Sequence, residues 1–90
     1  MNHKRITVAE KQVKLCFLTL DYKLYRSVKD GRDSYDVRIT MTNDLTDEAD
    51  ECTVTDVTSI KSEALRIFGL VSDGAVTPTC LHEVLYDLIG

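Results

Sequence analysis

The chain has 90 residues, of which 43% are hydrophobic and 29% are charged, and its formal net charge is −4. A chain of this length buries only about 60–65% of its unfolded surface, so we expect a single domain over residues 1–90 with one modest core. The single proline and four glycines exclude a disordered linker and a collagen-like repeat. The longest apolar run, Leu15–Leu18, is too short to span a membrane, and the N-terminus lacks an apolar stretch of signal-peptide length.

The three cysteines, Cys16, Cys52 and Cys80, favour an intracellular protein. An odd number of cysteines without a signal peptide is typical of reduced thiols, since secreted proteins usually pair theirs. The candidate soft metal ligands are these cysteines together with His3 and His82. Cys80 and His82 stand two residues apart on a predicted helix, so their side chains diverge and cannot hold one ion. We therefore expect a cytoplasmic protein with no metal and no cofactor.

Charge is divided unevenly along the chain. Residues 1–32 contain eight Lys and Arg against three acids, a net charge of +5, whereas residues 33–90 carry −9. Such asymmetry can mark a basic tail for an acidic partner. Here the basic residues alternate with apolar residues instead of forming a block, so we expect the two halves to face each other in the fold.

The strongest local signal is the Asp30-Gly31 pair, which is typical of a two-residue type I′ hairpin turn because both positions need positive φ. With these residues at the tip, opposed residues have numbers that sum to 61. Apolar residues then share one face of the hairpin, so the turn chemistry and the period-2 pattern agree. The opposed apolar pairs are Leu24 with Val37, Tyr22 with Ile39, and Leu20 with Met41.

The other strands follow from alternation and composition. We expect an earlier strand over Arg5–Glu10, a tight connection at Lys11–Gln12, and one long strand over residues 13–29 that leads into the turn. Cys52–Val57 is short and β-branched, which predicts a fourth strand. The segment before it, Asn43–Glu51, is predicted to be an acidic loop.

Two helices are predicted after Val57, where the apolar period changes to 3.6. Thr58 or Ser59 is expected to cap the first helix, and Gly74 to end it in a left-handed conformation. Thr77 is expected to cap the second helix, with Pro78 at its first position. The predicted apolar faces are Ile60, Ala64, Ile67, Phe68 and Val71 in the first helix, and Leu81, Val84, Leu85, Leu88 and Ile89 in the second.

These elements predict an α+β fold, with a four-stranded antiparallel sheet followed by a C-terminal helical hairpin packed on one face (ββββαα). The apolar arc of the first helix, widened by Leu65 and Leu70, is too broad for one neighbour. We therefore expect this helix to contact both the sheet and the second helix.

Catalytic motifs are absent from the sequence. It contains no glycine-rich phosphate-binding loop, no G-x-S-x-G and no H-E-x-x-H. The acidic loop fails as an EF-hand, because Ala49 and Thr55 stand where glycine and glutamate are required. A reactive thiol at Cys80, the third residue of the second helix, is an enzymatic alternative that stays open. Catalysis by paired carboxylates also stays open, although no pair is specified by spacing. We expect the protein not to be an enzyme.

Association remains as the main function class. If the helices cover one face of the sheet, Val13, Leu15, Phe17 and Tyr25 project from the other and form a mostly apolar strip. Tyr86, opposite the apolar stripe of the second helix, is a further candidate contact. The alternative is that a bulge or a crossing lets the first strand, through Ile6 and Val8, or the chain ends cover the strip.

We thus expect a non-enzymatic protein–protein interaction or regulatory module that binds a protein partner or a second copy of itself as a homodimer. The alternative from another class is an acidic nucleic-acid mimic that inhibits a nucleic-acid enzyme. Direct binding of nucleic acid is disfavoured by the acidic composition, and no membrane contact is indicated.

Three segments carry a resemblance to a known family: Tyr35–Val37, Val54–Ser59 and Val76–Ile89. The chain resembles a family of small uncharacterised proteins of clostridia and related Firmicutes, most specifically in its closing Val-Thr-Pro-x-x-Leu-x-Glu-Val-Leu-x-Asp-Leu-Ile. The family has Tyr-Gly-Ile where this chain has Tyr-Asp-Val. The resemblance implies a bacterial cytosolic domain and brings no activity, ligand or catalytic residue.

Overall fold

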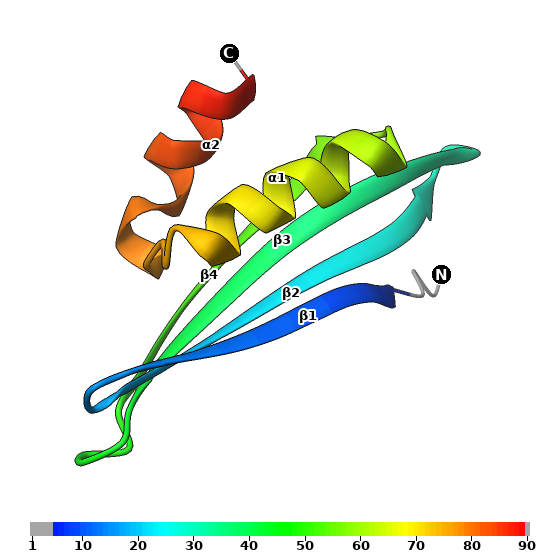
Figure 1. Cartoon of the computed structure of the whole chain (residues 1–90). Helices are drawn as coiled ribbons and strands as arrows, with labels where there is room; N and C mark the ends of the chain where they lie inside the picture. The colour runs from blue at the N-terminus through cyan, green and yellow to red at the C-terminus, as the bar shows by residue number, and fades with distance from the viewer. Residues whose placement is uncertain (1–4, 90) are drawn as a thin grey trace.

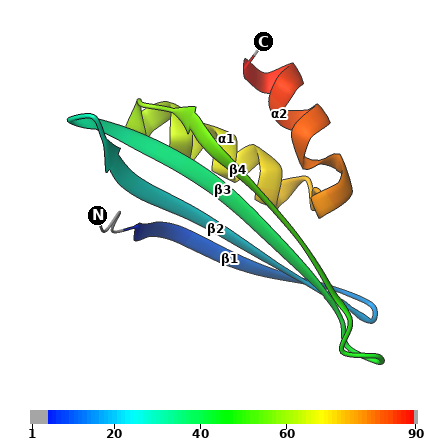
Figure 2. The same ribbon diagram turned by 180° about the vertical axis from the view of Figure 1, so that it is seen from behind.

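The structure, a computed structural model, describes residues 5–89. The four strands form one open antiparallel sheet in the order β1-β2-β3-β4, and both helices lie on the same face of it (Figure 1). Seen from behind, the other face of the sheet is uncovered (Figure 2). The α+β fold and the ββββαα order are confirmed. The elements are β1 (Ile6–Leu15), β2 (Leu18–Lys29), β3 (Arg32–Asn43), β4 (Ala49–Thr58), α1 (Lys61–Asp73), the 3₁₀ turn η1 (Pro78–Cys80) and α2 (Leu81–Ile89).

The hairpin of β2 and β3 has the predicted turn and register. Asp30 and Gly31 have φ of 54° and 75°, as a type I′ turn requires. The strands pair without a break from Lys29–Arg32 at the turn to Leu18–Asn43 at the far end. The apolar pairs expected from the sequence are therefore confirmed on the helix-covered face.

The first hairpin differs from the prediction. β1 runs through Lys11–Gln12 without a turn, and the chain reverses at Cys16–Phe17 instead. The predicted strands over Arg5–Glu10 and residues 13–29 are thus wrong in their bounds. Neither Cys16 nor Phe17 is a typical turn residue, and Cys16 nevertheless adopts a left-handed φ of 52°.

The fourth strand is longer than expected. β4 begins at Ala49, because β3 extends to Asn43 and Thr42 of β3 pairs with Ala49. The acidic loop therefore spans only residues 44–48. A bulge interrupts the pairing near the other end, between Tyr35 and Val37 of β3. Opposite it in β4, Asp56 has a left-handed φ of 55°.

The N-cap of α1 differs from the prediction, and its C-cap is the predicted residue in another conformation. The N-cap is Ile60, whose side chain makes no capping hydrogen bond, while the Thr58 hydroxyl accepts the Ile60 N–H at 3.2 Å in a turn before the helix. Gly74 is the C-cap, as predicted, and its N–H donates to the Leu70 carbonyl. Its φ is −81°, however, and the left-handed residue is Ala75, with φ of 51°. The predicted N-cap residues and the left-handed glycine are therefore wrong, although the helix ends at the predicted place.

The second helical segment begins as predicted and then differs in its first turn. Thr77 is extended and Pro78 occupies the first position. Residues Pro78–Cys80 form a 3₁₀ turn before the α-helix starts at Leu81. α1 contacts both the sheet and α2, as its wide apolar arc predicts, and α2 also contacts β4 directly.

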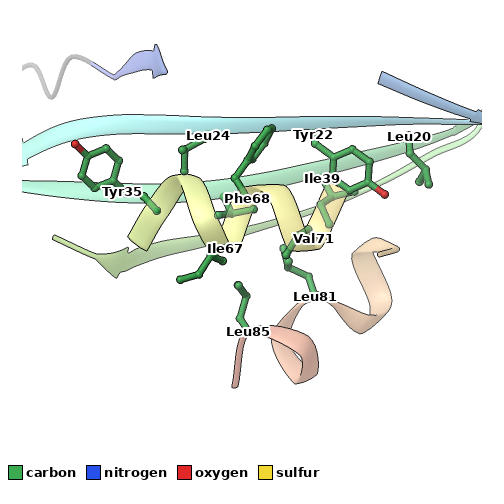
Figure 3. Packing of buried hydrophobic residues seen from close by; sticks show 12 residues of the cluster. Leu20, Tyr22, Leu24, Tyr35, Ile39, Ile67, Phe68, Val71, Leu81 and Leu85 are labelled. Carbon is green, nitrogen blue, oxygen red and sulfur yellow. The ribbon is translucent and has the colours of Figure 1, made fainter. Parts of the chain in front are cut away.

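The core lies between α1 and the middle of the sheet (Figure 3). Alternate residues of β2 and β3 point toward the helix, and one face of α1 packs on them. The buried hydrophobic residues are Leu20, Tyr22, Leu24, Tyr35, Val37, Ile39, Ala64, Ile67, Phe68, Val71, Leu81 and Leu85. The sheet extends beyond this core at the end that carries the β1–β2 and β3–β4 connections, where no helix covers it (Figures 1 and 2).

Tyr22 joins the sheet to the segment between the helices. Its hydroxyl donates to the Val76 carbonyl at 2.9 Å, and burial raises the pKa of Tyr22. Tyr22→Phe should lower the free energy of unfolding by about 1 kcal/mol at pH 7. Because the folded pKa is raised, the fold loses stability as pH rises above 10.0, and the variant should lose less. Urea unfolding at pH 7 and at a pH above 10.0 measures both effects. Tyr86→Phe, at an exposed tyrosine, should lose as much unfolding free energy between the two pH values as the wild type does.

Candidate interaction surface

The uneven charge of the chain is largely paired inside the fold. Basic residues of β1 and the residue before it contact carboxylates from the later part of the chain, as the alternation of basic and apolar residues predicts. The three pairs are Arg5–Asp36, Lys11–Asp73 and Lys14–Asp44, with N–O distances of 3.3, 2.6 and 3.9 Å. Residues 5–32 therefore do not form a separate basic tail, since most of them belong to β1 and β2 of the sheet.

The described residues offer little for metal or membrane chemistry. No three of the His, Cys, Asp and Glu side chains within residues 5–89 lie close enough to hold one ion. His3 lies outside the described residues. None of the helices in that range is long and apolar enough to cross a membrane.

Cys80 lies in a different setting from the one predicted. It is exposed and ends the 3₁₀ turn, so it is not the third residue of an α-helix. Its N–H donates to the Thr77 carbonyl at 3.1 Å and is not free to stabilise a thiolate. Within residues 5–89 no histidine, lysine or arginine side chain hydrogen-bonds to it.

The uncovered end of the sheet is built from two connections that lie side by side. The Asp44 N–H, in the β3–β4 loop, donates to the Phe17 carbonyl, in the β1–β2 turn, at 2.7 Å. The Thr19 hydroxyl donates to the Asp44 carboxylate at 2.9 Å, and Lys14 lies 3.9 Å from the same group. These contacts fix the two connections to each other, so their side chains are presented from a rigid base.

The β3–β4 loop is closed by its own hydrogen bonds. Asn43 donates its N–H to the Glu48 carbonyl and accepts the Asp47 N–H, both at 2.8 Å. The Asn43 side chain also accepts the Leu45 N–H at 3.0 Å. With its backbone held in this way, the Leu45 side chain points into solvent and is 70% exposed.

Together these connections form an apolar surface that we call the apolar end of the sheet. It consists of Val13, Leu15, Phe17, Leu18, Met41 and Leu45. Leu15 pairs with Leu18, and Val13 pairs with the core residue Leu20, so Val13 and Leu15 lie on the helix-covered face. Phe17 and Leu15 are 59% and 43% exposed because the helices do not reach this far.

The predicted placement of Val13 and Leu15 on the opposite face is therefore wrong, and Phe17 lies in the turn between β1 and β2. The turn at Cys16–Phe17 puts Val13 and Leu15 on a separate strand, whose register with β2 brings them to the helix side. The predicted alternative, that the first strand covers the strip, is also wrong, since Val13 and Leu15 are themselves part of that strand.

The two tyrosines lie on other surfaces. Tyr25 points to the uncovered face, half-buried, with the Arg5 guanidinium 5.7 Å from its ring centre. The hydrogen bond to Glu51, and secondarily the one to Tyr25, raises the pKa of Arg38 beside it. Tyr86 is 79% exposed on the outer side of α2. The five candidate residues thus occupy three separate surfaces.

The structure adds three residues that the sequence prediction missed: Leu18, Met41 and Leu45. Leu18 and Met41 share the helix-covered face with Val13 and Leu15, and the strand pairing alone brings them together. Leu45 could have been identified from the sequence, because an isolated leucine inside an acidic loop is an unusual apolar residue at an exposed position.

A family model matches residues 2–90, nearly the whole chain. The chain belongs to the DUF6514 family. The function of this family is unknown, so membership assigns no activity, ligand or binding site to the chain. No curated protein and no solved structure matches the chain. The arrangement of side chains is therefore the basis for a proposal about function.

Carboxylates surround the apolar end in this DUF6514 protein. Asp47, Glu48 and Asp50 are exposed in or beside the β3–β4 loop. Within residues 5–89, none of these three carboxylates lies within ion-pair distance of a lysine or arginine, whereas Asp44 pairs with Lys14. The apolar end is thus flanked by unpaired negative charge on its β3–β4 side, which we call its acidic rim.

Proposed function

We propose that this DUF6514 protein is a non-enzymatic interaction module of the bacterial cytoplasm that binds a protein partner through the apolar end of the sheet. The observation that carries the proposal is the exposure of Phe17 and Leu45, 59% and 70%, on two connections that are hydrogen-bonded to each other. Large apolar side chains on a preformed surface lose little conformational freedom when they bind. The cytoplasmic location is supported by three unpaired thiols, and the resemblance to proteins of Firmicutes supports a bacterial source.

The rim indicates the chemistry of the partner. Asp47, Glu48 and Asp50 leave uncompensated negative charge beside the apolar centre. A surface with apolar side chains flanked by lysine or arginine is complementary to this arrangement. Such a partner is held mainly by apolar burial, with the charges contributing orientation and association rate.

The acidic nucleic-acid mimic is the second candidate, and the same carboxylates favour it. A mimic would bind mainly through charge, so its affinity would fall steeply with salt, whereas apolar docking would persist. Salt dependence therefore separates the two functions. A thiol-dependent activity at Cys80 is the third, and alkylation of Cys80 no faster than that of Cys16, which is also exposed, would contradict it.

The test is a variant with Phe17→Asp and Leu45→Asp, immobilised beside the wild type and exposed to an extract of the source cells. Both side chains are mostly in solvent, so the fold should lose no more than about 0.5 kcal/mol for each change. Leu65→Asp, at a leucine of α1 that is 42% exposed, is the control for an aspartate placed elsewhere on the surface; it adds one negative charge, and the double variant adds two.

A protein that is retained by the wild type and by the Leu65→Asp control at high salt, and lost with the double variant, is the expected result. Retention that disappears from all three at high salt would support the mimic instead. The same proteins recovered by wild type and double variant at high salt would contradict docking at the apolar end.

A further inference from the structure

We propose that β1 pairs antiparallel with β1 of a second copy, so that two sheets join into one sheet with four strands from each copy. This inference deepens the proposed function by naming a self-partner, and it involves a different part of the molecule from Phe17 and Leu45. β1 is an edge strand, and no helix or strand formed by residues 5–89 lies beyond it in either view (Figures 1 and 2). An unpaired edge offers backbone groups to another strand.

The strand pairing determines which backbone groups of β1 point outward. The two-residue turn closes on the pair Leu15–Leu18, and hydrogen-bonded pairs alternate along an antiparallel ladder. The odd-numbered residues from Ala9 to Leu15 therefore bond to β2, and Glu10, Gln12 and Lys14 direct their N–H and C=O groups outward. The β2–β3 hairpin gives the same assignment, because its closing pair commits the odd-numbered residues of β2 to β3.

The side chains of the outward-bonding residues select one register. With Gln12 on the two-fold axis, Glu10 lies opposite the partner's Lys14, and the symmetry repeats this ion pair on the other side of the axis. A register centred on Glu10, Lys11 or Lys14 places two like charges on the axis. A register centred on Val13 forms no opposite-charge pair. Charge complementarity therefore favours the register centred on Gln12.

The helix-covered face is compatible with the same register. Leu15, 43% exposed in one copy, lies opposite the partner's Ala9, and Val13 lies opposite the aliphatic part of the partner's Lys11. A two-fold axis perpendicular to the sheet keeps the helices of both copies on one face. Val13 and Leu15 belong to both surfaces, whereas Phe17 and Leu45 lie outside the paired segment of β1 and stay available to another protein in the dimer.

The other edge strand does not suit self-pairing. β4 carries Asp50, Glu51 and Asp56 with no lysine or arginine, so two copies of it repel each other. The left-handed Asp56 also breaks its regular pairing, and α2 contacts this side of the molecule. β1 is therefore the edge that a second copy fits.

The test is the solution mass by light scattering over a dilution series, for the wild type, Glu10→Lys, Lys14→Glu and the double variant. We expect twice the 10.2 kDa of one chain at high concentration and a single chain at low concentration. Each single variant places like charges opposite each other twice and should weaken dimerisation about tenfold. The double variant reverses both ion pairs between the copies and should restore dimerisation. Because Lys14→Glu also removes the contact of Lys14 with Asp44 in its own chain, each variant is first checked for an unchanged circular dichroism spectrum and urea midpoint.

Gln12→Pro provides a second, independent variant. It removes an N–H that β2 does not use, so the fold should persist by circular dichroism while the dimer is lost. A single-chain mass at every wild-type concentration, a double variant that stays as weak as the single ones, or a mass that grows beyond two chains would overturn the inference. If the wild type is monomeric but still retains a partner through Phe17 and Leu45, the proposed function survives and only the dimer is wrong.

Discussion

Leu24→Ala should lower the free energy of unfolding by about 2–5 kcal/mol, because it opens a cavity where the sheet meets α1. Leu24 is fully buried, pairs with Val37 in the sheet and lies against the face of α1 that carries Phe68 (Figure 3). A domain of this size has a total stability of roughly 5–13 kcal/mol, so the loss is a large fraction of it. Urea unfolding followed by far-UV circular dichroism measures the change.

Leu70→Ala is the matched control for this prediction, since the same atoms are removed from a leucine that is 47% exposed on α1. We expect it to cost no more than about 1 kcal/mol. Equal losses for Leu24→Ala and Leu70→Ala would contradict a core located between α1 and the sheet.

Asp36→Ala should cost about 2–3 kcal/mol, the second-largest effect we expect, because it leaves two polar groups without their partner. Asp36 is 3% exposed, although it lies on the uncovered face of the sheet. Its carboxylate accepts the Asp56 N–H at 2.8 Å and lies 3.3 Å from the Arg5 Nε. Asp56 has a left-handed backbone and in turn accepts the Ser34 hydroxyl at 3.0 Å. The carboxylate therefore holds the β4 bulge against β3.

Two variants separate the contributions of Asp36. Asp36→Asn keeps an oxygen for the Asp56 N–H and should cost roughly half as much as Asp36→Ala. Arg5→Ala removes only the half-exposed partner, whose ion pair contributes about 1 kcal/mol or less. If Asp36→Ala costs no more than Arg5→Ala, the hydrogen bond to Asp56 does not stabilise the bulge.

The middle hairpin could be predicted to the residue because two independent signals coincide there. Asp30-Gly31 supplies the positive φ of the turn, and alternation places Leu24, Tyr22 and their partners on one face. The helices could likewise be predicted from the 3.6-residue period of their apolar residues. The ends of α1 could not be predicted in detail, because Thr58 uses its hydroxyl in a turn before the helix. At the other end Ala75 adopts the left-handed conformation that a glycine would adopt more easily.

The first hairpin could not be located from turn chemistry, since Cys16 and Phe17 carry none of the usual turn signals. The length of the predicted strand indicates the error, because a strand over residues 13–29 is longer than most in globular proteins and is therefore expected to contain a turn. The error moved Val13 and Leu15 to the wrong face. It also concealed that β1 is long enough to present Glu10, Gln12 and Lys14 as a continuous edge.

The candidate surface depended on information that only the fold supplies. Phe17 was identified from its apolar character, but its neighbour Leu45 is 28 residues away and reaches it through the Asp44–Phe17 hydrogen bond. Leu18 and Met41 are ordinary strand residues whose exposure follows from the length of α1, which ends before it covers them.

Residue-resolved amide hydrogen exchange at high and low protein concentration tests most directly whether this chain acts by association. The outward amides of Glu10, Gln12 and Lys14 should exchange slowly in concentrated protein and rapidly after dilution. The amides of Lys11 and Val13, which bond to β2, should stay slow at both concentrations. Rapid exchange of the three outward amides at every concentration would contradict association through β1.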